Sequence, residues 1–598
     1  MTIHVNCVIG SIEYSDDNVN VNFISNSGVS EEQLNQIRET ILFPFQKKSS
    51  KDTSESFIVY KTIFNDTNIY YIAKIKEAKD NLRDFQVIII DEAAFALIHY
   101  DPYFLQKLFT FDTKKGESPL DISNIISDAQ SFNVPDSMGD MPRAFLNAIQ
   151  SLVPPDVDYI KVLKVIIDVL FRKSNFLLAT PKSQLIHNLI RGIVYLMPRQ
   201  LRKDYSFILG LPIEGNGLLR VLISFEPLNF NDFDKLIENA HSIVFSDFTE
   251  IPEEKISPIT SFVTEMFPKL PSTLFARAKK LEEVLDVAGR IEYDFSLLQK
   301  YVMRVKYLDE VGKALSDSKY DLAIDLYYKV LELDKDLGID YAKSTIDGLR
   351  HLLEYIEDDN LKKNTLLHTL EILRPIPEFA DVAMDILETG IKTITMDEIK
   401  AIFITSFMDR VRDNTYLIIS TFELMLTYLE EKLSIVVASH TFGYLNEYLL
   451  NLIRRDKTYE NVLNELWSIY ITYFVRRSLV GALTDSFKAL LINKIISNIR
   501  NPQVAAAFEH VMRNVVSLMN EIFERERASD DLRNSVFTVV GKSFAQIGSE
   551  YITRNRDYLL GLSFYVDGLS YLTTYEDCLL YTSPSPRDLS TSRMPSSA

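Results

Sequence analysis

The sequence predicts a chain in two parts, an α+β N-terminal half followed by an all-α half. In residues 1–250, stretches of alternating apolar and polar side chains are separated by turn residues, which is the pattern of half-buried strands. From about residue 275 onward this alternation stops, glycine and proline become sparse, and apolar side chains recur at helical spacing. With 598 residues, 46% of them hydrophobic, the chain is long enough for three or four packed domains.

Residues 1–115 are predicted to form a compact α+β domain. The alternation over Val19–Phe23 follows a strand-like stretch and a polar turn, which predicts a β-hairpin. Ser30 lies three positions before Gln33, the spacing of a capping box that satisfies two backbone amides at a helix start. Three further strands and a closing helix, interrupted near Asp101-Pro102, complete the predicted order β-β-α-β-β-β-α.

This order of elements resembles the longin fold, a small sheet with helices that recurs in membrane-trafficking proteins and regulators of GTPases. The resemblance rests on element order over about 110 residues. Profilin-like and roadblock-like domains share much of the same order, so they stay open as alternatives.

Residues 116–155 are polar and contain several prolines, which predicts a linker. Residues 156–272 are predicted to form a second α/β domain with a mixed sheet of its own. Its expected elements are, in order, a helix over 160–170, a strand over 176–179, a helix ending before Pro198, and paired strands over 206–209 and 218–225.

The order helix, strand, helix, Leu-Met-Pro, strands resembles the central DENN module, which follows a longin-like unit in GTPase regulators. The stretch LMPRQLR, followed by a Ser-Phe pair, also resembles bacterial GTPase-associated proteins. The DENN resemblance implies guanine-nucleotide exchange on Rab-like GTPases. In that reaction, contacts around the nucleotide are displaced and no covalent bond changes.

Residues 273–577 are predicted to form an all-α region. Two sets of four residues have the spacings 3, 4 and 3 of a tetratricopeptide unit, in which a small residue lets paired helices approach and tyrosines fill the groove. They are Tyr320, Ala323, Tyr327 and Val330, and Tyr558, Gly561, Tyr565 and Gly568. We therefore predict an irregular solenoid of helix pairs, tetratricopeptide-like in part, with a plain helical bundle as the alternative.

Residues 578–598 are predicted to be no part of the natural protein. CLLYTSPSPRD fits, in one reading frame, the transposon-end adapter of short-read DNA libraries, and SRMPSSA fits the distal end of the same adapter. The tail is therefore excluded from fold prediction, as any non-native segment is. We expect the natural protein to continue beyond Asp577.

Composition restricts the class of partner. The formal net charge of −19 argues against general nucleic-acid binding, which needs Lys and Arg at the phosphates. Cys7 is the one thiol outside the tail, so no disulfide framework is expected. With no signal-peptide pattern and no apolar run of about 20 residues, we predict a cytoplasmic protein without a transmembrane segment.

A basic segment from Lys161 to Lys203 contains nine basic residues and one acid, Asp168. Such a concentration of positive charge attracts an acidic protein face, anionic lipid or phosphate. Docking against the acidic helical region of the same chain and a solvated face are the alternatives. The side chains expected to contact a partner are Arg172, Lys173, Lys182, Arg191, Arg199, Arg202 and Lys203.

Motifs that would carry chemistry are incomplete. Val87–Glu92 has the outline of a strand ending in a magnesium-binding carboxylate, but Gly541–Ser543 lacks the upstream glycine of a phosphate-binding loop. Asp334–Thr345 imitates a calcium loop without the bidentate Glu at its twelfth position. None of the eight histidines has another within four positions. We predict no catalytic residue, no metal and no cofactor.

Two functions are predicted from these observations. In the first, the protein is a regulator or adaptor of a small Ras- or Rab-like GTPase, which contacts the basic segment, and its helical region binds a second protein. In the second, it is a general scaffold whose helical solenoid binds peptides, with no GTPase role. Peripheral contact with an anionic membrane is compatible with either function.

Overall fold

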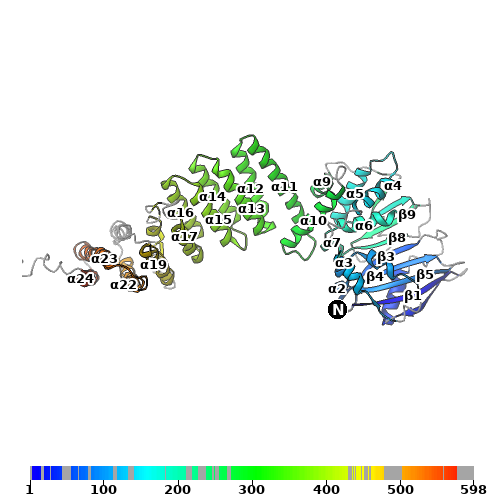
Figure 1. Cartoon of the computed structure of the whole chain (residues 1–598), viewed down its shortest axis with the longest axis horizontal. Coiled ribbons are helices and arrows are strands. Elements are labelled where there is room, and N and C mark those ends of the chain that lie inside the picture. The colour runs from blue at the N-terminus through cyan, green and yellow to red at the C-terminus, as the bar shows by residue number, and fades with distance from the viewer. Residues whose placement is uncertain are drawn as a thin grey trace, which may run out of the picture. The chain divides into compact units, whose positions relative to one another are not determined.

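The chain, seen here in a computed structural model, forms two compact units, residues 1–306 and 307–598 (Figure 1). The structure describes residues 3–575 apart from several gaps. These gaps are 15–18, 27, 43–54, 65, 78–81, 112–117, 132–140, 182, 211–217, 226–237, 246–247, 249–254, 266–270, most positions between 429 and 458, 477–501 and 556–557.

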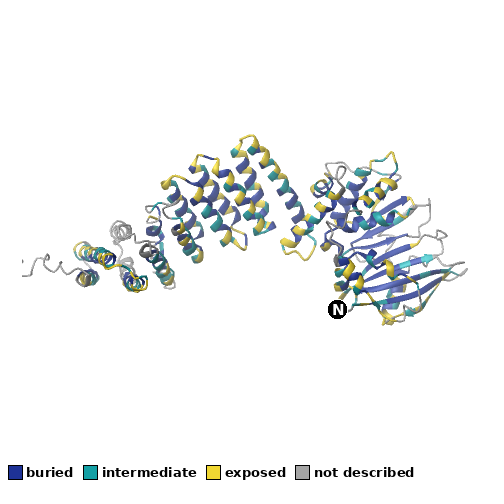
Figure 2. Ribbon diagram, viewed as in Figure 1, coloured by how far each residue is buried: buried dark blue, intermediate teal, exposed yellow. Residues whose placement is uncertain are grey.

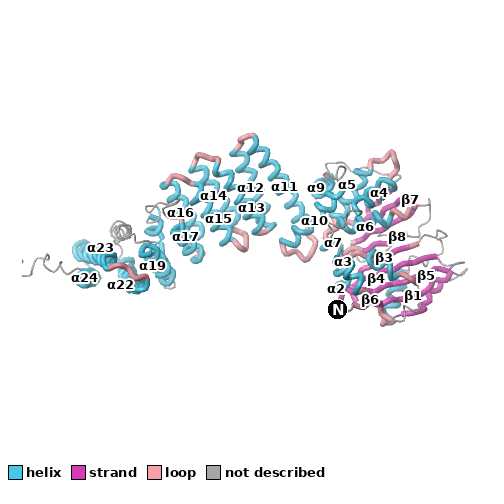
Figure 3. The backbone as a smooth tube through the Cα atoms, in the orientation of Figure 1, coloured by secondary structure: helices cyan, strands magenta, loops and turns pink. Residues whose placement is uncertain are grey.

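The first unit is built on one mixed sheet of ten strands (Figure 3). The strands are β1 (His4–Tyr14), β2 (Val19–Asn26), β3 (Ser56–Phe64), β4 (Thr67–Glu77), β5 (Leu82–Asp91), β6 (Leu120–Asp121), β7 (Phe176–Pro181), β8 (Ser206–Leu209), β9 (Leu218–Ser224) and β10 (His241–Val244). Their order across the sheet is β10-β7-β9-β8-β3-β4-β5-β1-β2, and β6 pairs with β1. All these pairs are antiparallel except β10 with β7.

The local predictions for the start of the chain are confirmed. β1 and β2 form an antiparallel hairpin in which Ile12 lies opposite Val21. The Ser30 hydroxyl accepts a hydrogen bond from the backbone of Gln33, whose side chain accepts one from the backbone of Ser30, so the capping box is complete. The expected order β-β-α-β-β-β-α is also present.

The expectation of two separate sheets is wrong. β3 pairs with β8 through Phe57–Leu209, Ile58–Ile208 and Val59–Phe207, which joins the strands of residues 1–115 to those of residues 156–272. An open strand edge exposes unsatisfied backbone N–H and C=O groups, and this pairing satisfies them on both sides. Buried residues consequently continue along the strands across the junction (Figure 2).

Helices cover both faces of this sheet. On one face, Ile37 and Ile41 pack against strand residues that include Tyr71. On the other, Tyr70 contacts Phe95 with ring centroids 4.7 Å apart. The helical segments of this unit are α1 (Glu31–Gln36), η1 (Ile37–Ile41), α2 (Glu92–Leu97), η3 (Pro102–Leu108), α3 (Ser123–Ser131), α4 (Met141–Leu152), α5 (Tyr159–Phe171), α6 (Ile186–Leu196), α7 (Arg199–Arg202), α9 (Pro258–Thr264) and α10 (Pro271–Val287).

The predicted linker over residues 116–155 contains structure. It holds strand β6 and helices α3 and α4, and Phe145 and Ile149 of α4 are completely buried. Pro142 is one of the prolines of this segment, but it stands at the second position of α4, where a backbone N–H has no helical partner to lose. The break predicted near Asp101-Pro102 is confirmed, because α2 ends at Leu97 and η3 begins at Pro102.

The second unit is helical in the part of the chain that the structure describes. Helix α11 (Phe295–Ser316) crosses from the first unit into the second. The following helices are α12 (Tyr320–Leu337), α13 (Ile339–Glu354), α14 (Asp359–Leu373), α15 (Phe379–Thr393), α16 (Asp397–Val411), α17 (Thr415–Thr427), α19 (Tyr459–Arg476), α22 (Pro502–Arg525), α23 (Asp530–Glu550), η9 (Tyr551–Asn555) and α24 (Tyr558–Tyr575). Among the helices described, none is both long and apolar enough to cross a bilayer.

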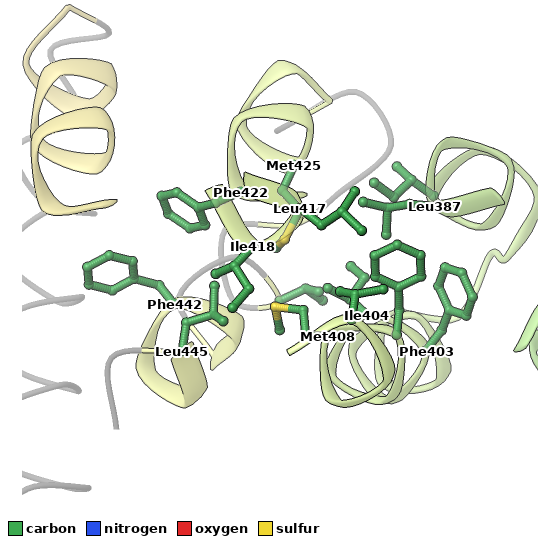
Figure 4. Packing of buried hydrophobic residues seen from close by; sticks show 14 of the residues in the cluster. Leu387, Phe403, Ile404, Met408, Leu417, Ile418, Phe422, Met425, Phe442 and Leu445 are labelled. Carbon is green, nitrogen blue, oxygen red and sulfur yellow. The ribbon is translucent and has the colours of Figure 1, made fainter. Parts of the chain in front are cut away.

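Helices α12 to α17 pack in a regular pattern. Consecutive helices such as α12 and α13 form pairs, and each helix also contacts the next but one, as α13 contacts α15. Figure 4 shows how α15, α16 and α17 share one apolar core, with Leu387, Phe403 and Leu417 turned toward one another. Because every helix buries two sides against neighbours, the apolar core is continuous along the stack.

The α23–α24 pair depends on glycine. A Cβ added at Gly548 would lie 2.6 Å from the carbonyl oxygen of Gly561, and one at Gly568 would lie 2.7 Å from the carbonyl oxygen of Gly541. The helix backbones are therefore too close for side chains at these crossing points. The small residues of the predicted 3-4-3 set do lie at a helix contact, but Tyr558 and Tyr565 are exposed and fill no groove.

Replacing Gly548 with alanine is expected to destabilise the second unit by about 1–3 kcal/mol, because the methyl group meets backbone atoms that cannot move aside. Gly312→Ala in α11 is the matched control. No atom lies within 4 Å of its added Cβ, so it should stabilise by up to about 1 kcal/mol. Urea unfolding read by the single tryptophan, buried Trp467, measures both variants. A Gly548→Ala midpoint equal to that of the native chain would contradict the close approach.

Asp359 and Lys362 of α14 form a buried ion pair in the second unit. Lys362 Nζ donates to Asp359 Oδ1 (3.0 Å) and to the carbonyl oxygen of Thr393 (2.7 Å). The other Asp359 oxygen accepts hydrogen bonds from Thr395 N (2.9 Å) and Met396 N (2.7 Å). Burial opposes ionisation, but these hydrogen bonds outweigh it and lower the pKa of Asp359 to about 2.

This pKa gives a pH-dependent contribution to stability. An unfolded aspartate titrates near pH 3.9. The stabilisation from the Asp359–Lys362 ion pair is therefore fully present above that pH and is lost as the pH falls toward 2. Asp359→Asn should cost about 2.5 kcal/mol at pH 7, and the difference from the native chain should shrink between about pH 4 and pH 2. Exposed Asp317→Asn provides the control. Denaturant titrations across this range test the prediction, which fails if the difference does not change with pH.

Candidate functional site

The basic segment is distributed over three elements of the first unit. Arg172 and Lys173 directly follow helix α5, Arg191 lies within α6, and Arg199, Arg202 and Lys203 lie in or directly after α7. Lys182 lies outside the described residues. Of the seven side chains expected to contact a partner, the six that are described do not form one surface patch, because each bonds to a group of the same chain.

At the end of α5, Arg172 and Lys173 bind separate carboxylates. Arg172 Nε lies 2.6 Å from Asp168 Oδ2, and Lys173 Nζ lies 2.8 Å from Asp204 Oδ2. Asp204 also binds Lys61 of β3 at 2.9 Å, so it links a strand of the N-terminal segment to the basic segment. Burial raises the pKa of Asp204, but the hydrogen bonds from both lysines outweigh it and the pKa is lowered.

Arg191 belongs to a buried network centred on Asp101, the residue that caps η3. Asp101 is completely buried, and its Oδ1 accepts a hydrogen bond from the backbone of Tyr103 at 2.9 Å. Its Oδ2 accepts from Arg191 Nε at 3.1 Å and from the Tyr195 hydroxyl at 2.8 Å. Burial and the neighbouring Asp101 raise the pKa of Tyr195 above its usual range, so the hydroxyl stays protonated and donates.

The α7 residues bind acidic side chains of helix α10. Arg202 is buried and lies 2.9 Å from Glu282, while Arg199 lies 2.7 Å from Asp286. Lys203 Nζ donates to the carbonyl oxygen of Ile291 at 2.9 Å. Docking against the acidic helical region of the same chain is the alternative predicted for the basic segment. The α7 arginines do pair with Glu282 and Asp286, but α10 belongs to the first unit and carries as many basic as acidic residues.

A cavity of about 840 Å³ lies between these elements. Tyr100 and Tyr195 form part of its wall, and residues of α2, α7 and α10 complete it. His99 and Tyr100 both have positive φ, 58° and 55°, a strained conformation for residues other than glycine. The His99 carbonyl oxygen accepts a hydrogen bond from Arg202 at 3.3 Å, which fixes this strained turn. Arg199 and Arg202, two of the charged residues in its lining, are already bonded to acids of α10.

The incomplete motifs have structural roles. Asp91 ends β5 and caps α2 by accepting a hydrogen bond from Ala94 N at 2.7 Å. Asp334 is buried and accepts a hydrogen bond from the Thr345 hydroxyl at 2.6 Å, which joins α12 to α13. Gly541–Ser543 lies inside helix α23. Among the described residues, no group of three or more His, Cys, Asp or Glu side chains is placed to hold a metal ion.

Sequence analysis missed the acids that neutralise the basic segment. Asp101, Asp204, Glu282 and Asp286 all lie outside the interval Lys161–Lys203, so a charge count within that interval could not include them. One local signal existed for Asp101, since an aspartate directly before a proline is typical of a helix cap. The contacts to α10 had no comparable local signal.

Comparison with protein-family models, with curated proteins and with solved structures finds no match to this chain. The longin, DENN and tetratricopeptide resemblances are thus supported by element order and residue spacing alone.

Asp101→Asn is expected to destabilise the first unit by about 3 kcal/mol, because it leaves Arg191 with a charge that its buried neighbours do not balance. Asp128→Asn is the matched control. Asp128 is exposed and lies 3.9 Å from Lys107, so its replacement should change stability by less than about 1 kcal/mol. Calorimetry should show a lower transition for Asp101→Asn while the Trp467 fluorescence transition stays in place. Equal effects of the two substitutions would contradict the buried network.

Proposed function

We propose that this protein is a non-enzymatic interaction scaffold whose helices α12–α17 form a solenoid that binds a basic segment of a partner protein. The packing pattern of these helices is the observation that carries the proposal. Stacked helix pairs produce a long surface that no single helix provides, and such surfaces are used to bind extended protein segments.

The charge of this region supports a basic partner. Residues 307–450 contain 27 acidic and 14 basic side chains, whereas residues 451–577 contain 15 of each. The negative charge of the helical unit is thus concentrated on the regular stack. Charge complementarity of this kind speeds association and selects partners more than it increases affinity.

The α13–α15 face shows this potential locally. Burial raises the pKa of Asp385, and the nearby acids Glu388, Asp347 and Asp381 raise it further, against the opposing effect of Lys343. Acidic side chains on two neighbouring helices therefore act on one position. A lysine- or arginine-rich segment lying across α13 and α15 would relieve this repulsion.

Regulation of a small GTPase stays a prediction. This prediction needs a basic segment that faces a partner. The six described side chains that were expected to contact it bond instead to acids and carbonyl groups of the first unit. A GTPase contact through these residues would have to compete with those bonds. A basic segment on the stack would also compete with ion pairs, those of Asp347 with Arg350 and of Asp381 with Lys343, but these pairs are exposed and contribute less to stability than a buried network.

The proposal is tested by fluorescence anisotropy with the full chain and labelled peptides of opposite charge. A lysine- and arginine-rich peptide should bind, and its glutamate-substituted counterpart should not. Asp347→Asn combined with Asp381→Asn should weaken binding by about three- to tenfold, since both side chains are exposed and each removes one attractive charge.

Glu521→Gln combined with Glu524→Gln on α22 is the control, because it removes the same charge from exposed positions outside the stack. Equal weakening by both pairs would show that binding is unspecific and would contradict the proposal. Faster nucleotide release from a purified small GTPase, without peptide binding, would favour the GTPase regulator instead.

A further inference from the structure

The cavity lined by α2, α7 and α10 has the size of a small-molecule site. Its volume of about 840 Å³ falls within the range of roughly 300–1,000 Å³ that is usual for pockets that bind small organic ligands. All of its lining residues belong to the first unit. We call it the α2–α10 cavity.

Apolar side chains form much of the wall of the α2–α10 cavity. Tyr100, Tyr195, Met197 and Phe275 all contribute to this wall, and each of them is buried. Binding pockets for organic molecules are typically lined by apolar and aromatic side chains, with a few polar groups that fix the orientation of the ligand. The wall therefore favours a ligand with an apolar and largely aromatic body.

The strained turn in this wall is held in place by buried groups. His99 and Tyr100 both line the cavity and both have positive φ. The hydroxyl of completely buried Tyr205 donates to the Tyr100 carbonyl oxygen at 3.0 Å, and Arg202 donates to the His99 carbonyl oxygen at 3.3 Å. A strained backbone persists where its surroundings fix it, and such turns cluster at ligand sites. The wall is thus preformed.

The acids of the lining are already bonded within the chain. Among the described lining residues, three are acidic and five are basic. Each of the acids, Glu92, Glu282 and Asp286, accepts hydrogen bonds from side chains of the first unit. A cationic ligand would have to displace these bonds, so the lining does not favour a cation.

Two ammonium groups of the lining have no carboxylate partner among the described residues. Lys203 Nζ donates to the carbonyl oxygen of Ile291, which is neutral and leaves the positive charge unbalanced. Lys279 of α10 is half-buried, and it forms no hydrogen bond or ion pair with any other residue that the structure describes. Positive charge in a partly enclosed cavity attracts anions, because the surrounding protein screens it less than water does.

We propose that the α2–α10 cavity binds a small organic anion. Its aromatic body lies against Tyr100, Tyr195 and Phe275, and its anionic group is held by Lys203 and Lys279. Such a ligand contacts α2, α7 and α10 together and therefore stabilises the first unit. The proposal does not rest on the scaffold function, which concerns helices α12–α17 of the second unit.

The first test fills the cavity. Anilinonaphthalene sulfonate, an aromatic anion, is the probe, and equilibrium dialysis with the full chain measures its binding. Ala96→Trp places a large ring at an exposed position of α2 that lines the cavity, so it should weaken binding by about tenfold or more. Ala93→Trp, at an exposed position of the same helix outside the lining, should leave binding unchanged. Equal binding to the native chain and to Ala96→Trp, or no binding to either, would overturn the proposal.

The second test separates the charge of the ligand from its apolar body. Lys279→Gln should weaken binding of the sulfonate by about two- to fivefold, which is the effect of one partly exposed charge. It should not change the binding of phenylnaphthylamine, which has the same rings without the sulfonate. Lys280→Gln is the control, because it removes the same charge at the next position of α10, where the lysine lies 3.0 Å from Glu283 and outside the lining.

The outcome for Lys279→Gln decides the class of ligand. Unchanged binding of the sulfonate, equal weakening of both probes, or equal weakening by Lys280→Gln would overturn the proposal. Because Lys279 has no bond to another described residue, its replacement should leave the melting temperature unchanged, and weaker binding will not reflect unfolding. Failure of the basic peptide to bind helices α12–α17 would leave these results unaffected.

Discussion

The pairing of β3 with β8 is the constraint on which the first unit depends. Three residue pairs, from Phe57–Leu209 to Val59–Phe207, join strands from distant parts of the chain into one ten-stranded sheet. The Ser56 hydroxyl donates to the carbonyl oxygen of Gly210, and Lys61 N donates to the Ser206 hydroxyl, so both ends of the junction are also fastened by side chains. Once the sheet is continuous, each face must be covered along its whole length, and the segment expected to be a linker contributes to that cover.

The internal charge pairs follow from the same constraint. The sheet brings η3, α6 and α7 together, so that Asp101 meets Arg191 and the α7 arginines meet acids of α10. Replacing one member of such a pair with a neutral residue destabilises the fold, because the other member keeps a charge that has little access to water. A basic segment that looks like a binding surface in the sequence is therefore part of the packing between elements.

Local features were predictable from the sequence and long-range ones were not. The Ser30–Gln33 capping box and the β1–β2 hairpin depend on neighbouring residues, and both are confirmed. The β3–β8 pairing and the Arg202–Glu282 contact depend on which distant segments meet, and neither strand alternation nor charge counts contain that information. The exposed apolar row of α24, formed by Leu559, Leu562, Val566 and Leu569, is an intermediate case. Its 3-4-3 spacing is visible in the sequence, but only the structure shows which side of the helix is already covered.

The most direct test of the central claim is hydrogen exchange of the β3 and β8 backbone amides in the full chain across a urea series. If one sheet spans both segments, the amides at Val59 and Phe207 should open with the same free energy and the same urea dependence, because they are released by one cooperative unfolding event. Exchange of the β8 and β9 amides through a lower-energy opening that leaves β3, β4 and β5 protected would show two separate sheets and contradict the account.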